Sequence, residues 1–136
     1  MSLVIDASVT LAWYFEDEST PAIDAVLDRV VKSGASVPNL WRLEVANAFQ
    51  SAIRRKRIAA SYRDEALATL SQLAIVVDAE TDAYAWSTTL RLAERHGLTP
   101  YDAAYLELAQ RRSLPLATLD KKLSDAAVAL DVAVIR

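Results

Sequence analysis

The chain has 136 residues, 53% of them hydrophobic, which fits a single domain with a buried core spanning residues 1–136. It contains no cysteine and one histidine, so disulfides, thiolate nucleophiles, cysteine-based zinc sites and a histidine acid–base pair are excluded. The formal net charge is −3, whereas nucleic-acid-binding domains are usually strongly basic, so any contact with nucleic acid must come from local patches.

Nothing in the sequence indicates a membrane span or a signal peptide. The longest apolar runs, such as Ala74–Val77, are far shorter than the roughly 20 residues that a span requires. The N-terminus lacks a basic region followed by an apolar stretch and a small-residue cleavage site. We therefore expect a cytoplasmic protein.

Short apolar strands alternate with helices along the chain. In the first part of the chain we expect a strand at Leu3–Ile5, helices at Val9–Phe15 and Pro21–Lys32, and a strand at Ala35–Val37. Two helices follow, from Pro38 to about Arg57 and from Ser61 to about Leu73, and then a strand at Ala74–Val77. The last part is expected to form helices at Glu80–His96 and from Thr99-Pro100 to about Arg112, a strand at Leu116–Leu119, a helix at Lys121–Leu130 and a strand at Val132–Ile135. Ser8 is expected to cap the first helix, and Gly34 to end the second. The helix after Pro38 carries Leu40, Leu43, Ala46, Asn47 and Ser51 near one face.

This alternation predicts an α/β fold, with a mainly parallel sheet covered by helices on both faces. Ligands of such sheets bind at the carboxyl ends of the strands, near the point where the strand order reverses. Asp6 ends the first predicted strand and Asp120 immediately follows the fourth. Both acids are therefore expected at a ligand site.

Four acids are candidates for that site, and each also has an ordinary structural explanation. Asp6 and Asp120 fit helix caps, Glu44 fits a solvated helical charge, and Asp102 completes a capping box that begins at Thr99. The neighbouring residues favour a shared site. Two alanines after Asp102 would let its helix start close to the strand ends, and Glu44 lies among apolar positions. A carboxylate is costly to bury there unless it is paired or binds a metal.

Carboxylates that converge on one cleft repel one another, and a divalent cation removes that repulsion. Oxygen ligands suit Mg²⁺ or Mn²⁺ and do not suit zinc. Such an ion can activate water and stabilise charge on a phosphate during transfer. Ser8 and Thr118 bring hydroxyls near Asp6 and Asp120, where they would orient a ligand carboxylate or a metal-bound water, or only cap a helix and a strand end.

Four segments together resemble PIN-domain proteins, and more narrowly the VapC-type toxins of type II toxin–antitoxin pairs. They are Val4–Val9, Val37–Ala48, Thr99–Tyr105 and Ala117–Asp120, in matching order and spacing over nearly the whole chain. The resemblance implies a three-layer α/β/α sandwich around a five-stranded sheet of order 3-2-1-4-5. It also implies Mg²⁺- or Mn²⁺-dependent endoribonuclease activity, a small antitoxin partner and a homodimer.

By motif position, the resemblance assigns the catalytic and metal-binding roles to Asp6, Glu44, Asp102 and Asp120, with Ser8 and Thr118 as supporting hydroxyls. Asp125 is a further acid that matches no motif position.

Contacts with RNA and protein partners are less strongly specified. Lys121 and Lys122 directly follow Asp120 and are the basic residues that we expect to reach RNA, although such residues more often form solvated helix ends. The run Trp13–Phe15 cannot be buried on one helical face, so at least one ring is expected at an antitoxin or dimer contact, unless the run covers the edge of the core. His96 is expected to end a helix and not to bind metal.

Two other functions compete with a nuclease. A non-catalytic module would hold RNA or protein in the same cleft, but a pure RNA binder would gain from losing the acids there. A phosphate-receiver domain shares the size and the strand–helix alternation. It requires an acidic pair after the first strand and a phosphorylatable Asp after the third, and this chain matches neither.

Overall fold

The computed structural model describes residues 2–135, which form a five-stranded sheet in which every neighbouring pair of strands is parallel. The strands are β1 (Val4–Ile5), β2 (Ala35–Val37), β3 (Ile75–Val77), β4 (Leu116–Ala117) and β5 (Val134–Ile135). Their order across the sheet is β3-β2-β1-β4-β5, which confirms the predicted fold class and strand order.

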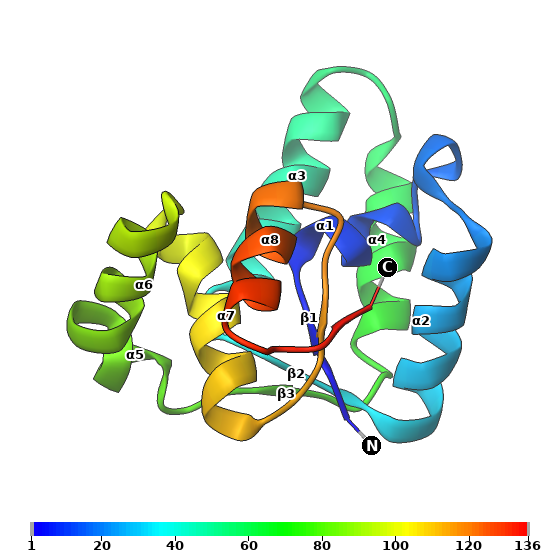
Figure 1. Ribbon diagram of the computed structural model, residues 1–136. Helices are drawn as coiled ribbons and strands as arrows, with labels where there is room; N and C mark the ends of the chain where they lie inside the picture. Colours follow the sequence, from blue (N-terminus) through cyan, green and yellow to red (C-terminus); the bar gives the residue numbers. More distant parts are fainter. Residues whose placement is uncertain (1, 136) are drawn as a thin grey trace.

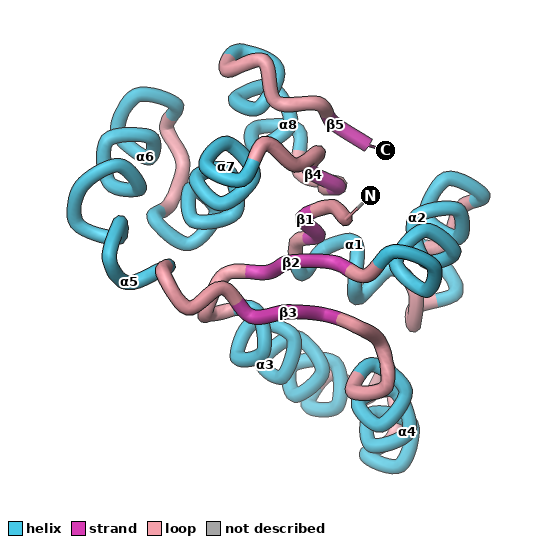
Figure 2. The backbone as a smooth tube through the Cα atoms, turned by 90° about the horizontal axis from the view of Figure 1, so that it is seen from below, coloured by secondary structure: helices cyan, strands magenta, loops and turns pink. Residues whose placement is uncertain are grey.

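Helices cover both faces of this sheet (Figure 1). They are α1 (Ala7–Ala12), α2 (Pro21–Ser33), α3 (Trp41–Arg54), α4 (Ala60–Leu70), α5 (Thr81–Tyr84), α6 (Leu90–His96), α7 (Pro100–Arg112) and α8 (Lys121–Ala129), with a 3₁₀ helix at Glu16–Glu18 and a π-helix at Ala85–Thr89. Figure 2 shows α1 to α4 on one side of the sheet and α5 to α8 on the other. Right-handed crossovers require this division, because the chain adds β2 and β3 in one direction and β4 and β5 in the other. The strand order reverses between β1 and β4, where a ligand site is expected.

In the core, α7 packs over β1 and β4. Leu3, Val4 and Ile5 are fully buried, and every residue of α7 from Ala103 to Ala109 is buried. This packing fixes the start of α7, and with it Asp102, close to the carboxyl ends of the two central strands. None of the helices within residues 2–135 has both the length and the apolar character needed to cross a bilayer.

Several helix boundaries follow the sequence signals. Thr20 and Thr99 cap α2 and α7 through their side-chain oxygens, and a proline occupies the first turn of each helix. Gly34 ends α2 with a φ of 73°, and a Cβ at this position would lie 2.6 Å from the Ala74 carbonyl oxygen. A glycine is therefore required where α2 turns into β2.

The first helix differs from the prediction. Asp6, and not Ser8, is its N-cap, and α1 ends at Ala12, before the aromatic run. The three rings are therefore not confined to one helical face and pack against the chain's own core. The Trp13 indole donates a hydrogen bond to a backbone carbonyl of α2, and the Tyr14 and Phe15 rings each lie 6.0 Å from the Phe49 ring. The run covers the core edge, the second of the two readings of the sequence.

The predicted face of the long helix was wrong. The buried stripe of α3 consists of Trp41, Val45, Phe49 and Ala52, whereas Leu43 is 77% exposed. The large apolar residues at a spacing of three to four determine which face is buried, and the predicted stripe included the polar Asn47 and Ser51. α3 is also shorter than expected at both ends, and α4 begins at Ala60 without Ser61 as its cap.

The helix expected over Glu80–His96 is divided in three. The π-helix Ala85–Thr89 separates α5 from α6. A π-helical turn inserts one extra residue, which shifts the buried face along the sequence. Thr89 accordingly faces inward with Leu92 and Ala93, while Trp86 is 94% exposed.

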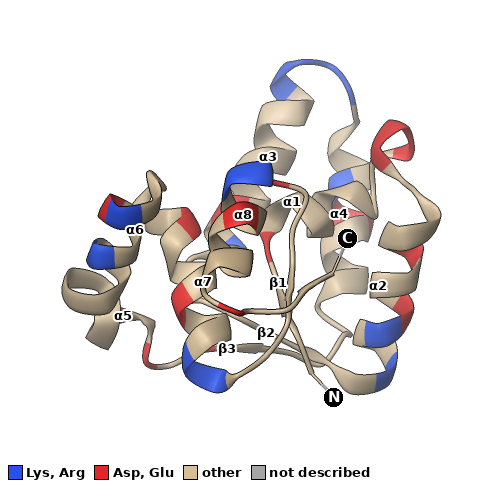
Figure 3. Ribbon diagram, in the orientation of Figure 1, with Lys and Arg blue, Asp and Glu red and all other residues tan. Residues whose placement is uncertain are grey.

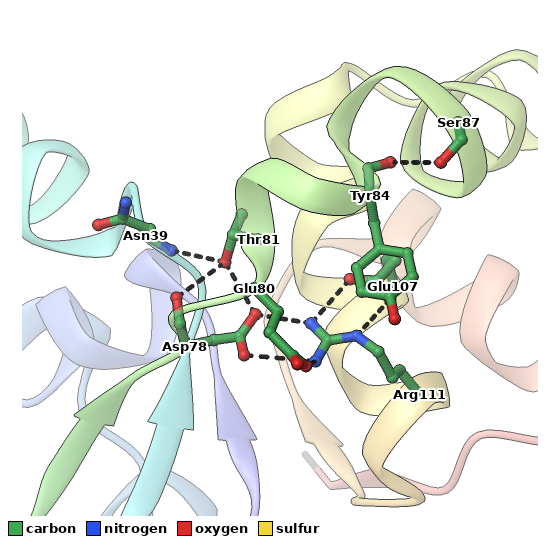
Figure 4. Close-up of polar contacts among 8 residues, drawn as sticks. All are labelled: Asn39, Asp78, Glu80, Thr81, Tyr84, Ser87, Glu107 and Arg111. Carbon is green, nitrogen blue, oxygen red and sulfur yellow. Dashed lines mark hydrogen bonds and ion pairs between the residues drawn. The ribbon is translucent and has the colours of Figure 1, made fainter.

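An ion network that is buried at Asp78 and Glu107 joins the start of this segment to α7 (Figure 4). The Arg111 guanidinium donates to Asp78 at 2.6 Å, to Glu107 at 2.8 Å and to Glu80 at 2.9 Å, and it lies 4.7 Å from the centre of the Tyr84 ring. The donors of Arg111 are therefore committed to the fold and are not directed to solvent.

Candidate active site

The four candidate acids lie at the N-terminal ends of four helices. Asp6 and Asp120 are the N-caps of α1 and α8, and Glu44 and Asp102 lie in the first turns of α3 and α7. A helix N-terminus carries partial positive charge, so each position favours a carboxylate. Figure 3 shows the acidic segment at the end of β1 and the basic segment at the start of α8 above it.

Asp6 is the most deeply placed of these acids, with 5% of its surface exposed. Its Oδ1 accepts hydrogen bonds from the Ser8 hydroxyl at 2.6 Å and the Val9 amide at 3.1 Å, and its Oδ2 accepts one from the Thr118 hydroxyl at 2.5 Å. Burial raises the pKa of the Asp6 carboxyl, and these donors offset part of that rise. The carboxylate is thus held in one orientation and still favours a positive partner.

The two predicted hydroxyls connect β1 to β4. β4 ends at Ala117, two residues earlier than predicted, so Thr118 leaves the sheet beside Asp6. The Thr118 hydroxyl accepts a hydrogen bond from the Asp120 amide at 3.0 Å, and the Ser8 hydroxyl accepts one from the Leu119 amide at 3.1 Å. Both hydroxyls therefore orient Asp6 and also fix the backbone that carries Asp120.

Glu44 reaches the site from α3 and is half-buried. Its Oε1 accepts a hydrogen bond from the Tyr105 hydroxyl at 2.5 Å. Burial raises the pKa of Glu44, the bond from Tyr105 opposes that rise, and the charges of Asp102 and Asp6 add to it. Tyr105 has no role in the prediction from the sequence, although it lies one helical turn after Asp102 and therefore on the same side of α7.

Asp120 performs the capping role considered from the sequence, whereas the bond between Thr99 and Asp102 uses the backbone amide of Asp102. The Asp102 amide donates to the Thr99 hydroxyl at 3.1 Å, which completes the cap of α7, and Asp120 accepts from the Leu123 amide at 3.0 Å. Burial raises the pKa of Asp102, and the negative charge of Asp120 raises it further. A helix cap and a charged site are therefore not exclusive explanations for Asp120.

The charges of the four acids influence one another, but their side chains do not surround a single metal position. Asp102 interacts with the charges of Asp6, Glu44 and Asp120, and so links all four. As they stand, no three Asp, Glu or His side chains within residues 2–135 are grouped closely enough to hold one metal ion. The donor set is nevertheless entirely oxygen, as Mg²⁺ or Mn²⁺ prefers, and the charges of neighbouring acids add to the rise in pKa that burial causes in Asp6, Glu44 and Asp102.

The basic residues after Asp120 differ in their contacts. Lys121 forms an ion pair with Asp125 at 2.7 Å, and both side chains are exposed. Lys122 is exposed and extends toward the turn before α7, with its Nζ 3.9 Å from the position that a Cβ on Gly97 would take. His96 ends α6, as expected.

The family to which the chain belongs is decided by its match to a profile of the PIN domain over residues 3–129, from β1 to the last residue of α8. The chain is a member of the PIN domain family. All four candidate acids of this PIN domain lie within the matched region.

Among curated proteins, Ribonuclease VapC3 of Pyrobaculum aerophilum is 29% identical over 125 residues, which cover 92% of this chain and 94% of the relative. The crystal structure of PAE2754 from Pyrobaculum aerophilum matches with a TM-score of 0.68 and 25% identity, covering 93% of this chain and 84% of that one.

Two further structures support the fold alone. FitAcB from Neisseria gonorrhoeae has a TM-score of 0.68 and 19% identity and covers 100% of this chain and 97% of that one. VapBC2 from Rickettsia felis, bound to a DNA fragment from their promoter, has a TM-score of 0.64 and 14% identity and covers 98% and 97%.

Proposed function

We propose that this PIN domain is a Mg²⁺- or Mn²⁺-dependent endoribonuclease and the toxin of a toxin–antitoxin pair, acting in the cytoplasm. The observation that carries the proposal is the convergence of four acids, from four helix N-termini, at the switch point of the sheet. The similarity to Ribonuclease VapC3 over nearly the full length of both chains supports RNA as the substrate.

Asp6, Glu44, Asp102 and Asp120 would hold the cation. When bound, the ion would activate a water molecule and stabilise charge on the phosphate. Because the four carboxylates do not already enclose one position, Asp102 and Asp120 would turn toward Asp6 and Glu44, which their hydrogen-bond donors keep in place. Lys122 would contact the RNA backbone on the side of α8. Lys121 would have to leave Asp125 to do the same.

The partners proposed for the chain are RNA, a small antitoxin and a second copy of the chain. VapC3 is named as a ribonuclease, and the VapBC2 structure, which shares the fold of this chain, was solved with promoter DNA. Both names are consistent with a toxin that acts on RNA and pairs with a partner protein.

A non-catalytic module that holds RNA or protein in the same cleft is the alternative. Within residues 2–135, no three Asp, Glu or His side chains are arranged to hold one metal ion, which favours this second function. The repulsion between the neighbouring acids opposes it, because repulsion that serves no ion would only weaken the binding of a negatively charged RNA.

Cleavage of structured RNAs by the purified protein, with Mn²⁺ and with EDTA, separates the two functions. We expect cleavage only with Mn²⁺, and loss of at least about 100-fold in rate for Asp6→Asn or Asp102→Asn, since each removes a charge that would hold the ion. Asp28→Asn, on the exposed side of α2, is the matched control and keeps full activity. Full cleavage by Asp6→Asn would refute the nuclease, and RNA binding without product in Mn²⁺ would favour the binding module.

A further inference from the structure

Tyr105 places a hydroxyl donor among three of the acids. The side chain is 1% exposed, and its hydroxyl bonds to Glu44, a residue 61 positions away on α3. The charges of Glu44, Asp6 and Asp102 all act on it, and burial raises the pKa of the phenol above its usual value, so the hydroxyl keeps its proton. A neutral donor thus lies in a site otherwise composed of carboxylates.

The contact matters more for Glu44 than for the other acids. Asp6 has three donors, and Asp120 is held by the backbone of α8. Within residues 2–135, Tyr105 is the one hydrogen-bond partner of the Glu44 carboxylate. A glutamate has several freely rotating side-chain bonds, whereas a buried tyrosine on a packed helix has one fixed position. The phenol therefore determines where the Glu44 carboxylate lies.

We propose that Tyr105 is a positioning residue that orients Glu44 for binding a divalent cation. The inference rests on the proposed function, because it takes Glu44 as a ligand. The phenol engages Oε1, which leaves Oε2 and a lone pair of Oε1 directed elsewhere. Groups that orient a metal ligand in this way typically contribute 10- to 100-fold to metal affinity.

The test is calorimetric titration of the purified full chain with MnCl₂ in the absence of RNA. Tyr105→Phe removes only the hydroxyl oxygen and keeps the ring in the core. We expect its Mn²⁺ dissociation constant to rise by about 10-fold or more. Tyr62→Phe is the matched control, because the Tyr62 hydroxyl makes a 2.6 Å bond to the Tyr14 carbonyl and touches no acid. Its dissociation constant should equal that of the unchanged chain.

A second comparison separates positioning from general damage to the fold. In a Glu44→Gln background, the added Tyr105→Phe change should weaken Mn²⁺ binding no further, because the carboxylate that it orients is gone. An equal loss in both backgrounds would show a merely structural role and overturn the inference. So would unchanged affinity in Tyr105→Phe when the unchanged chain binds Mn²⁺. If the unchanged chain neither binds Mn²⁺ nor cleaves RNA, the proposed function fails first, and this inference falls with it.

Discussion

Asp6 shows how one residue can be both a structural cap and a poised ligand. Its hydrogen bonds from Ser8, Val9 and Thr118 stabilise the ionised form, and its burial destabilises it. Because burial is the larger effect, ionisation of the Asp6 carboxyl still costs free energy although its hydrogen bonds are well formed. Hydrogen bonding thus fixes the geometry of the site, and the residual cost of ionisation provides the tendency to bind a cation.

The raised pKa of Asp102 predicts a pH-dependent cost of the metal-free fold. The folded state binds this proton more tightly than the unfolded chain does, so the group favours folding below about pH 4 and loses that contribution as pH rises through the folded pKa. Asp102→Asn should therefore be more stable than the unchanged chain at about pH 8 and similar to it at about pH 4. Urea denaturation in EDTA measures the free energy of unfolding at each pH.

Asp28→Asn controls for a general change in net charge. Its gain in free energy of unfolding at high pH should be clearly smaller than that of Asp102→Asn. Mn²⁺ should abolish the advantage of Asp102→Asn, because the ion then compensates the acids of the unchanged chain. A constant difference between the two proteins at all pH values would contradict the prediction.

The sequence predicted the site residues to different degrees. Asp6 and Asp120 could be placed from strand ends alone, because parallel strands bring their carboxyl ends to one edge. Glu44 and Asp102 depended on the resemblance to a family, since a helix position does not show which elements it will face. Tyr105 was missed for the same reason, because its contact with Glu44 exists only once α3 and α7 are packed.

At the scale of elements, hydrogen bonds at two places hold the helices that carry the acids in position relative to one another. The Trp41 indole of α3 donates to the Thr10 hydroxyl of α1 at 3.0 Å. On the other side, the Thr81 hydroxyl accepts from the Asn39 amide at 3.0 Å and donates to Asp78, which Arg111 of α7 also binds. These contacts connect α1, α3 and α7 outside the acidic site itself, so changes there should act on stability first.

Arg111→Met is predicted to lower the free energy of unfolding by about 3–5 kcal/mol, because it leaves Asp78 and Glu107 buried and without their cation. Hydrogen bonds from Arg111 and Thr81 hold the pKa of Asp78 below its usual value despite burial, which raises it. That stabilisation is present above the unfolded pKa and is lost as pH falls, so the penalty should shrink below about pH 4.

Denaturation by urea checks this value, with Arg112→Met as the matched control. Arg112 is exposed and adjacent in sequence. Its substitution should change the free energy of unfolding by no more than about 0.5 kcal/mol. A similar small effect of Arg111→Met would show that the network contributes little to the fold.

Local signals predicted those elements whose ends are determined locally. Thr99-Pro100 and Gly34 marked true boundaries, because capping and a positive φ depend on adjacent residues. The π-helix at Ala85–Thr89 was missed, since it is decided by packing against other elements. The buried face of α3 follows from the spacing of its large apolar residues, and the prediction failed because it included Leu43, which is exposed, and two polar residues.

For the whole molecule, the site joins segments that the chain separates widely. Asp6 follows the first strand and Asp120 lies shortly after the fourth, and Glu44 and Asp102 lie on helices on opposite sides of the sheet. A cation held by all four would connect both helical layers through the two central strands. Its binding should therefore stabilise the domain as a unit and not one loop, because it binds the folded arrangement and no separated part of it.

Hydrogen exchange with and without Mn²⁺ tests this expectation. At about 100 times the dissociation constant, binding adds about 2.7 kcal/mol, so amides that exchange through global unfolding should slow by about 100-fold. The slowing should include the buried amides of β1, β4 and α7 together, and Asp6→Asn should lose most of it while Asp28→Asn keeps it. Protection limited to the start of α8 would mean that Asp120 binds the ion without the other three acids. The four carboxylates would then interact electrostatically without being ligands of the same metal ion.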